Sequence, residues 1–325
     1  MESPAVPPSP APPPPPALPE PPARARPPRF DPPNILWFAG AYAIALGSYG
    51  LLETLPTTRH SLWVLVAALA FVLVYAIGSW FLLRARWWVP RGLAAAVTVA
   101  MVPGLSVAFL KLIRVWPEHP GDPLESFSGH TLAVAGVTAL AALVAFALAR
   151  FAFLFALFVA SILIGAQIVV AANGSPSGDD RATAALIAGA LVVIVGVFLD
   201  AFGRRREGFW FHALGWFSVA AGLVFFTFEG TGDHNRGWIP MLIVGVMMVI
   251  VSGPIRRATW AIYGVLGYYA PVLHYLARGL NESRWTFATA ALGVGLSIFV
   301  FGIVLQRFGG PVAERFVRRP PPTVA

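Results

Sequence analysis

The segment TLAVAGVTALAALVAFALARFAFLFALFVASILIGAQIVVAA, residues 131–172, decides the fold. Its one charged residue, Arg150, separates two apolar runs, 131–149 and 151–172. An α-helix needs roughly 20 residues to cross a hydrocarbon core of about 30 Å, and each run has about that length. A third long run covers residues 62–83. We therefore predict transmembrane helices, with a very tight turn at Arg150.

The composition of the whole chain extends this prediction. Of its 325 residues, 57% are hydrophobic and 12% are charged, whereas an ordinary soluble domain has about 25% charged residues. A soluble protein can bury one continuous apolar helix, but not a long series of them. We therefore predict an all-α fold, a polytopic transmembrane helical bundle. The chain has no cysteine, which excludes disulfides and thiolate chemistry.

About ten hydrophobic runs follow one another in the central part of the chain, with approximate limits 34–52, 62–83, 92–115, 131–149, 151–172, 184–202, 209–228, 238–253, 258–277 and 285–306. The run at 238–253 is short and the break at Arg150 is tight, so a count of ten is weakest at these two places. Ten helices divide into two groups of five, which permits the inverted repeat of many transporters. No motif shared by the two halves shows one.

Basic residues test this count independently. If the N-terminus is cytoplasmic, 16 arginines fall in inner segments, and six arginines with the single lysine fall in outer ones. Cytoplasmic loops carry such an excess of positive charge. We therefore predict ten helices with both termini in the cytoplasm. The strong preference for Arg over Lys, with many Ala, Gly and Pro residues, suggests a bacterial source and hence an inner (plasma) membrane.

Three regions follow from this pattern. Residues 1–33 are rich in proline, which lacks a backbone donor and fixes φ, so extended polyproline or disorder is expected. They lack the features of a signal peptide. We expect a solvated cytoplasmic tail, with a ligand for a proline-recognising domain as the functional alternative. Residues 34–307 form the transmembrane domain, and residues 308–325 form a second, basic cytoplasmic tail that ends in prolines.

Few ionisable side chains lie inside the predicted spans. Asp200 and Arg204 are four residues apart, so on one helix face they would form an ordinary ion pair. Lys111 and Arg114 close the third span and can extend to the headgroups. Binding of a lipid headgroup or another anionic ligand is the sharper alternative for these two residues.

Two histidines lie near opposite ends of their spans. His274 shares a helical stripe with Tyr263, and Tyr268 and Pro271 lie in the same segment. These residues are candidates for a ligand-binding or proton-responsive site that faces a cavity. The ordinary alternative, which also applies to His212, is a neutral histidine hydrogen-bonded across a helix interface. Because the two histidines lie near opposite faces, we do not expect them to share a metal ion.

Backbone breakers indicate where a span could bend. Pro103 lies in the middle of the third span and Pro271 in the ninth, and each removes a helical hydrogen bond. Broken helices frame the substrate site in transporters, although static kinks are common. Gln167 is suited to bonding a neighbouring helix. The candidate binding residues are thus His274, Tyr268, Tyr263, Pro271, Pro103, Gln167, Lys111 and Arg114.

Residues 256–275, RRATWAIYGVLGYYAPVLHY, look like a bacterial family of multi-pass membrane proteins to which no activity is assigned. A basic pair, an aromatic residue and G-x-x-G-Y precede a helix end that contains histidine. Residues 102–118, VPGLSVAFLKLIRVWPE, and the aromatic stretch 209–216 also look similar. The resemblance covers roughly half of the chain. It implies an inner-membrane helical bundle and no particular reaction.

Three functions are open at this point. A small-molecule transporter or permease-like protein is favoured by the helix number, short loops and interrupted helices, a plan similar to that of the drug/metabolite transporter superfamily. A non-transporting scaffold or accessory subunit would use the proline-rich tail to bind a protein partner. A membrane-embedded enzyme comes third, because no catalytic set can be named. The lipid bilayer is the expected partner; no nucleic acid, metal site or cofactor is predicted.

Overall fold

A computed structural model describes residues 32–54, 62–84, 87–117, 128–174, 176–228, 236–255 and 257–279, with six further residues between 292 and 300. Within these residues the chain is helical, without strands, which confirms that the fold is all-α. The elements are α1 (Pro32–Thr54), α2 (Leu62–Arg84), α3 (Trp88–Leu112), α4 (Gly129–Ala149), α5 (Leu154–Val170), the 3-10 turn η1 (Ala171–Asn173), α6 (Gly178–Ala201), α7 (Arg205–Phe228), α8 (Trp238–Ile255) and α9 (Ala258–Gly279).

Each of the first nine predicted runs coincides with one of these helices. Six of them, α2, α3, α4, α6, α7 and α8, are long and apolar enough to cross a membrane, which fits a multi-pass membrane protein. The apolar helix α5 has 17 residues and continues into η1. The tenth run, 285–306, lies outside the described residues except for those six. The count of ten and the cytoplasmic placement of both termini therefore stay predictions.

Local chemistry explains two helix boundaries. The backbone N–H of Asp180 donates to the Ser177 hydroxyl at 3.2 Å, and the Asp180 carboxylate accepts from the Ser177 backbone N–H at 3.0 Å. This capping box stabilises a polar first turn, so α6 begins at Gly178 rather than near the predicted 184. The predicted break between α4 and α5 is confirmed. Arg150 adopts a left-handed conformation, with φ of 51°, and its N–H donates to the Phe146 carbonyl at 2.7 Å.

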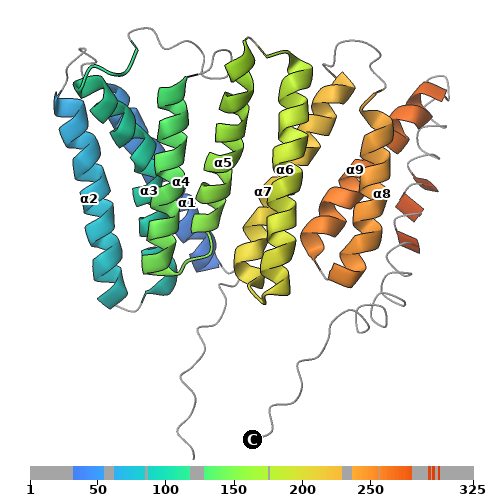
Figure 1. The fold of residues 1–325 in the computed structure, drawn as a ribbon. Coiled ribbons are helices and arrows are strands. Elements are labelled where there is room, and N and C mark those ends of the chain that lie inside the picture. Colours follow the sequence, from blue (N-terminus) through green and yellow to red (C-terminus); the bar gives the residue numbers. More distant parts are fainter. Residues whose placement is uncertain are drawn as a thin grey trace, which may run out of the picture.

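Consecutive helices run in alternating directions and pack mainly on their neighbours in sequence (Figure 1). The pairs α2–α3, α4–α5, α6–α7 and α8–α9 are in extensive contact, and α1 packs chiefly on α3. A core of small and apolar side chains, including Leu93, Ala142 and Leu154, joins α3, α4 and α5. Helix α5 also contacts α6 and α7, while α7 contacts α8 and α9. The fold is thus a series of antiparallel helices held together by neighbouring pairs.

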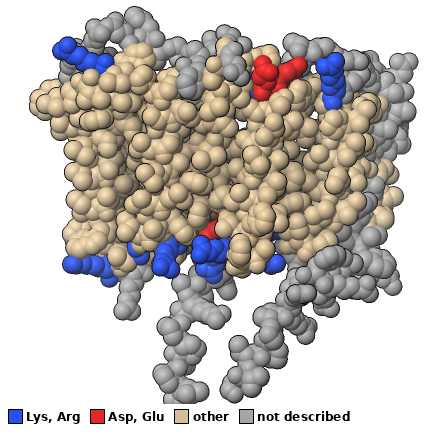
Figure 2. All heavy atoms as spheres, viewed as in Figure 1, with Lys and Arg blue, Asp and Glu red and all other residues tan. Residues whose placement is uncertain are grey.

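The described charges separate to the two ends of the bundle (Figure 2). The end at which α1 begins carries seven arginines, at positions 84, 91, 150, 204, 205, 206 and 257. The opposite end carries Lys111 and three arginines, at 114, 181 and 236, together with Asp179 and Asp180. Basic residues mark the cytoplasmic side, and the predicted orientation, which rests on this same excess, stays a prediction. We refer to the first end as the arginine-rich end.

Glycines spaced seven residues apart bring α6 and α7 together. Gly189 and Gly196 on α6 face Gly208, Gly215 and Gly222 on α7. A Cβ atom added to Gly189 would lie 2.7 Å from the Gly215 carbonyl oxygen, and one added to Gly222 would lie 2.7 Å from the Ala182 carbonyl oxygen. Small residues let membrane helices approach until their backbones touch. The α6–α7 pair is therefore a close-packed unit.

Candidate functional site

An ion pair joins the α6–α7 pair to the α8–α9 pair at the arginine-rich end of the bundle. Asp200 occupies the last turn of α6, and Arg257 lies in the link between α8 and α9. The Arg257 Nε atom donates to Asp200 Oδ2 at 2.8 Å, and its Nη2 atom donates to Asp200 Oδ1. The two side chains are only 13% and 12% exposed. This bidentate contact ties the end of α6 to the start of α9, and such geometry makes a strong charged hydrogen bond.

His212 of α7 joins the same carboxylate and is fully buried. Its Nε2 atom lies 3.0 Å from Asp200 Oδ2, and the Trp260 indole Nε1 donates to its Nδ1 atom at 3.1 Å. An indole N–H can only donate, so Nδ1 must accept and the ring proton must be on Nε2, directed at Asp200. The arrangement therefore requires the neutral Nε2–H tautomer. This confirms the expectation of a histidine hydrogen-bonded across a helix interface.

We call Asp200, His212, Arg257 and Trp260 the Asp200 cluster. Glycines of the α6–α7 pair make room for it. A Cβ atom added to Gly208 would lie 2.5 Å from Asp200 Oδ1. The same close packing that joins the two helices thus allows a carboxylate and an imidazole to fit between them.

Neighbouring side chains complete the shell around the cluster. Arg257 Nη2 also donates to the Arg205 carbonyl oxygen at 2.6 Å. The Tyr263 hydroxyl donates to the Ala213 carbonyl oxygen at 3.2 Å. The rings of Trp216 and Trp260 meet edge to face, with centroids 4.9 Å apart. Three helices, α6, α7 and α9, therefore meet here through polar contacts, and aromatic rings surround these contacts.

The expected ion pair between Asp200 and Arg204 is wrong. Helix α6 ends at Ala201, and Gly203 takes a positive φ of 77°. The chain therefore leaves the helical path before residue 204, and Arg204 is exposed. Asp200 instead pairs with a residue 57 positions away.

The four candidate residues on α9 lie along the length of that helix. Tyr263 lies one turn from Trp260 and thus beside the Asp200 cluster. Pro271 is fully buried, and Tyr268 is half-buried. The His274 ring stacks on Trp238, with centroids 4.1 Å apart and planes 13° from parallel. Its Nε2 atom is buried and has no hydrogen-bond partner among the described residues.

Two of the other candidate residues lie where hydrogen bonds link separate helices. Pro103 lies inside α3, next to Ala100, whose carbonyl oxygen accepts a hydrogen bond of 2.6 Å from the Tyr49 hydroxyl of α1. Tyr49 thus links α1 to α3 near the proline. Gln167 Nε2 donates to the Arg181 carbonyl oxygen at 3.3 Å and so links α5 to α6.

Lys111 and Arg114 are exposed at the end opposite the Asp200 cluster. Pro103 and Pro271 do not share a site, because α3 and α9, both described, make no contact with each other. The eight candidate residues therefore do not form one pocket. Only Tyr263 lies next to the cluster that the structure reveals, and the binding roles of all eight stay predictions.

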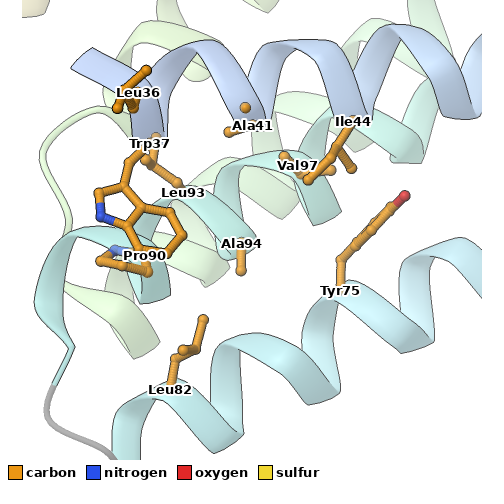
Figure 3. A pocket seen from close by; sticks show the side chains of 11 residues that line it. Leu36, Trp37, Ala41, Ile44, Tyr75, Leu82, Pro90, Leu93, Ala94 and Val97 are labelled. Carbon is orange, nitrogen blue, oxygen red and sulfur yellow. The ribbon is translucent and has the colours of Figure 1, made fainter. Parts of the chain in front are cut away.

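An apolar hollow lies far from this cluster, between α1, α2 and α3 (Figure 3). Its volume is about 610 Å³. Trp37 and Pro90 lie at one end and Tyr75 at the other. The Tyr75 hydroxyl shares a hydrogen bond of 2.6 Å with the Ser48 hydroxyl. Apart from the Trp37 indole nitrogen the labelled side chains are otherwise hydrocarbon, so the hollow suits an apolar chain better than a hydrated solute.

Sequence reasoning missed the role of Arg257, which contributed only to the count of inner charges and to the basic pair of residues 256–275. A lone aspartate inside an apolar span and a basic pair beside another span were the available signals. The glycines at 189 and 196 and at 208, 215 and 222 were a second signal, because their spacing places them on one helix face. Among the described residues no three His, Asp or Glu side chains gather closely enough to hold a metal ion.

Comparisons with known proteins add no functional assignment. The chain matches no protein-family model, and no curated protein or solved structure is significantly similar to it. The resemblance of residues 256–275 to a bacterial membrane family therefore rests on those stretches of sequence alone. The function has to be argued from the contacts within this chain.

Proposed function

We propose that the protein is a permease-like transporter of small molecules, in which the α8–α9 pair moves against the α6–α7 pair. The Asp200–Arg257 ion pair would hold the arginine-rich end closed. The observation that carries this proposal is the buried, bidentate contact between these two residues. A charged side chain inside a membrane span costs about 2.5–3.5 kcal/mol on insertion scales, so such residues usually serve a function.

The packing supports movement between the two helix pairs rather than within them. Glycine contacts close each pair internally, since Gly245 of α8 lies against the α9 backbone as Gly189 of α6 lies against that of α7. Between the pairs, side chains make the contacts: an apolar cluster of Val193, Trp216, Met248 and Trp260, the ion pair, and hydrogen bonds from Trp260 to His212 and from Tyr263 to Ala213. A second apolar cluster, of Val219 and Leu223 with Trp238 and Met241, lies toward the opposite end. Opening the arginine-rich end would therefore break these side-chain contacts, while the glycine contacts within each pair stay in place.

The chemistry of the ion pair suggests a class of solute. A guanidinium group presents a planar set of donors that fits a carboxylate or a phosphate with two hydrogen bonds. A solute with such a group would compete with Asp200 for Arg257. Small organic anions are therefore the substrate class that this arrangement favours.

Cysteine accessibility tests the transport proposal directly, because the natural chain contains no cysteine. Val244 of α8 packs into the contact between the helix pairs, whereas the adjacent Ile243 points outward and is 54% exposed. Val244→Cys and Ile243→Cys would be prepared in right-side-out and inside-out membrane vesicles. A charged, membrane-impermeant methanethiosulfonate reagent would then be added to each.

We expect the reagent to modify Val244→Cys from both sides, because alternating access exposes the same interior position to each face in turn. Ile243→Cys should stay unmodified, since it faces hydrocarbon. Adding Asp200→Asn should speed the modification of Val244→Cys from the arginine-rich side, and Arg204→Gln should not. A Val244→Cys variant that no reagent reaches from either side would contradict the transport proposal.

A scaffold or accessory subunit is the second candidate, and α1 favours it. The proline-rich segment leads directly into this helix, which exposes Leu36, Tyr42 and Leu51. Cβ atoms added to Gly40 and Gly47 would meet nothing within 4 Å. An open helix face next to a protein-binding tail would suit a partner that engages both. Deleting residues 1–31 should then abolish a disulfide cross-link between Gly47→Cys and an introduced cysteine of that partner; an unchanged cross-link would contradict a role for the tail.

A further inference from the structure

A groove runs along the outer face of α3, between α2 and α4. Helix α3 packs against both neighbours, but α2 and α4 make no contact with each other. Two hollows lie along this groove. One, of about 280 Å³, includes Ala76, Ser79 and Trp80 of α2, Arg91 of α3 and Leu148 of α4.

The second hollow lies nearer the opposite end of the same three helices. It has a volume of about 520 Å³ and includes Leu65, Phe109 and Val137. Its wall is almost entirely hydrocarbon. Because α2, α3 and α4 all qualify as membrane-spanning helices, this groove faces the acyl chains of the bilayer.

Basic side chains lie where the groove reaches the arginine-rich end (Figure 2). Arg91 lines the first hollow, and its Nη2 atom donates to the Leu148 carbonyl oxygen at 2.7 Å. This contact fixes the guanidinium at the mouth and uses only one of its five N–H donors. The Arg84 guanidinium carbon lies 4.0 Å from the centre of the Trp80 ring. Both arginines are therefore held by neighbouring groups at the groove mouth.

Aromatic residues mark the depth of this mouth in the membrane. Trp80 lines the hollow, and Trp88 lies 6.0 Å from the Arg91 guanidinium carbon. Tryptophan prefers the headgroup level of a bilayer. The two arginines thus lie where lipid phosphates lie, and the hydrocarbon groove begins directly beneath them.

We infer that this groove is a binding site for an anionic phospholipid. Its phosphate would pair with Arg84 and Arg91, and its acyl chains would lie against α2, α3 and α4. Basic pockets between membrane helices at the cytoplasmic side bind anionic headgroups in this way. The inference does not depend on transport, because the site lies on helices remote from the Asp200 cluster.

Native mass spectrometry of the full chain tests this inference, with phosphatidylglycerol as the anionic probe and phosphatidylcholine as the neutral one. We expect retention of phosphatidylglycerol over phosphatidylcholine. Arg84→Gln and Arg91→Gln should each weaken its binding about fivefold, and the double variant about 30-fold, as expected for arginines near an anionic surface. Arg204→Gln and Arg206→Gln, which remove exposed arginines at the same end, are the matched controls.

A second type of variant tests the hydrocarbon part of the site without changing its charge. Ala76 is exposed and lines the first hollow, so Ala76→Phe would fill the groove while both arginines stay in place. It should also reduce the binding of phosphatidylglycerol, and thermal unfolding without added lipid should show that the variant is folded.

Three results would overturn the inference. Equal retention of the two lipids would show an apolar groove without headgroup selection. Equal losses in the Arg84, Arg91 and control variants would show a general charge effect. Displacement of the lipid by excess inorganic phosphate, with no effect of Ala76→Phe, would show a phosphate site without a lipid.

Discussion

The helix pairs α1–α2 and α6–α7 have nearly the same length and a similar apolar composition, but they pack in opposite ways. Each helix has 23 or 24 residues. In α6–α7 the backbones touch along glycine-lined faces, whereas α1 contacts α2 only slightly and the two enclose part of the apolar hollow beside α3. The hydropathy of the helices does not reveal this difference in packing.

Glycine spacing alone does not explain the contrast. Gly40 and Gly47 of α1 are seven residues apart, as are Gly189 and Gly196 of α6, yet only the second pair faces another backbone. Close approach needs small residues on both helices, and α2 presents large side chains such as Phe71 and Tyr75 on its inner side. The tight pair can thus act as one rigid unit, and the open pair can admit a ligand or another helix.

The largest effect should come from filling the tight interface. In Gly215→Leu the new Cβ atom would lie 2.9 Å from the Gly189 carbonyl oxygen and 2.7 Å from a Val193 methyl group. Because backbone atoms would have to move, we expect a loss of about 3 kcal/mol or more in stability. Gly47→Leu, on the open face, should cost less than about 1 kcal/mol. Thermal unfolding in detergent compares the two variants, and equal losses would remove the contrast between the pairs.

The next largest effect should come from breaking the ion pair. Asp200→Asn or Arg257→Gln leaves one largely buried charge without its partner, so each should cost about 3 kcal/mol. Arg204→Gln should change stability by less than about 0.5 kcal/mol, because its side chain is exposed. The Asp200→Asn/Arg257→Gln double variant should lose less than the sum of the single losses. Strict additivity in denaturant titrations would show that the two residues do not interact.

A smaller effect is expected from Trp260→Phe, which removes the donor to His212 Nδ1 and keeps most of the ring packing. We expect a loss of about 1 kcal/mol, typical of one hydrogen bond. The ¹⁵N shift of His212 Nδ1 should also move, which a purely steric defect would not produce. An unchanged shift would contradict the tautomer assignment. Tyr263→Phe, which keeps the imidazole contacts, is the control for this spectrum.

The smallest effect on stability is expected at the loosely packed α1–α2 pair. Ala94→Leu adds apolar volume to the hollow between α1, α2 and α3, which Ala94 lines. We expect a change between zero and a gain of about 1 kcal/mol, because the added methyl groups replace empty space rather than packed atoms. Ala96→Leu, in the buried core of α3, should instead be destabilising. A large loss for Ala94→Leu in the same unfolding assay would show that the hollow is already filled by packed side chains.

The sequence was sufficient to locate the nine described α-helices, because insertion into lipid depends on the composition of each segment by itself. It was less reliable at helix ends, where a polar capping group such as Ser177 extends a helix beyond its apolar run. The sequence did not predict the partner of Asp200, because that partner depends on where α6 ends. A helix that continued past Gly203 would have favoured Arg204, whereas the observed turn leaves Asp200 to a distant arginine.

The candidate site shows the same limit. Pro103 and Pro271 each lie inside a continuous helix, and whether two such prolines face one cavity depends on how the helices are arranged. The glycines of α6 and α7 could have been found, since their sevenfold spacing predicts a common face. Which two faces meet is a property of the pair and not of either sequence segment.

The order of the helices has a consequence for how the chain enters the membrane. Most contacts join helices that emerge one after the other during synthesis, so each pair can insert as a hairpin before the next is made. The contact of Asp200 with Arg257 forms later, because the arginine follows only after two further helices. During that interval His212, which belongs to the same hairpin as Asp200, already supplies a hydrogen-bond donor to the carboxylate. His212 can thus bond the Asp200 carboxylate at the membrane edge before Arg257, its counter-ion, has been synthesised.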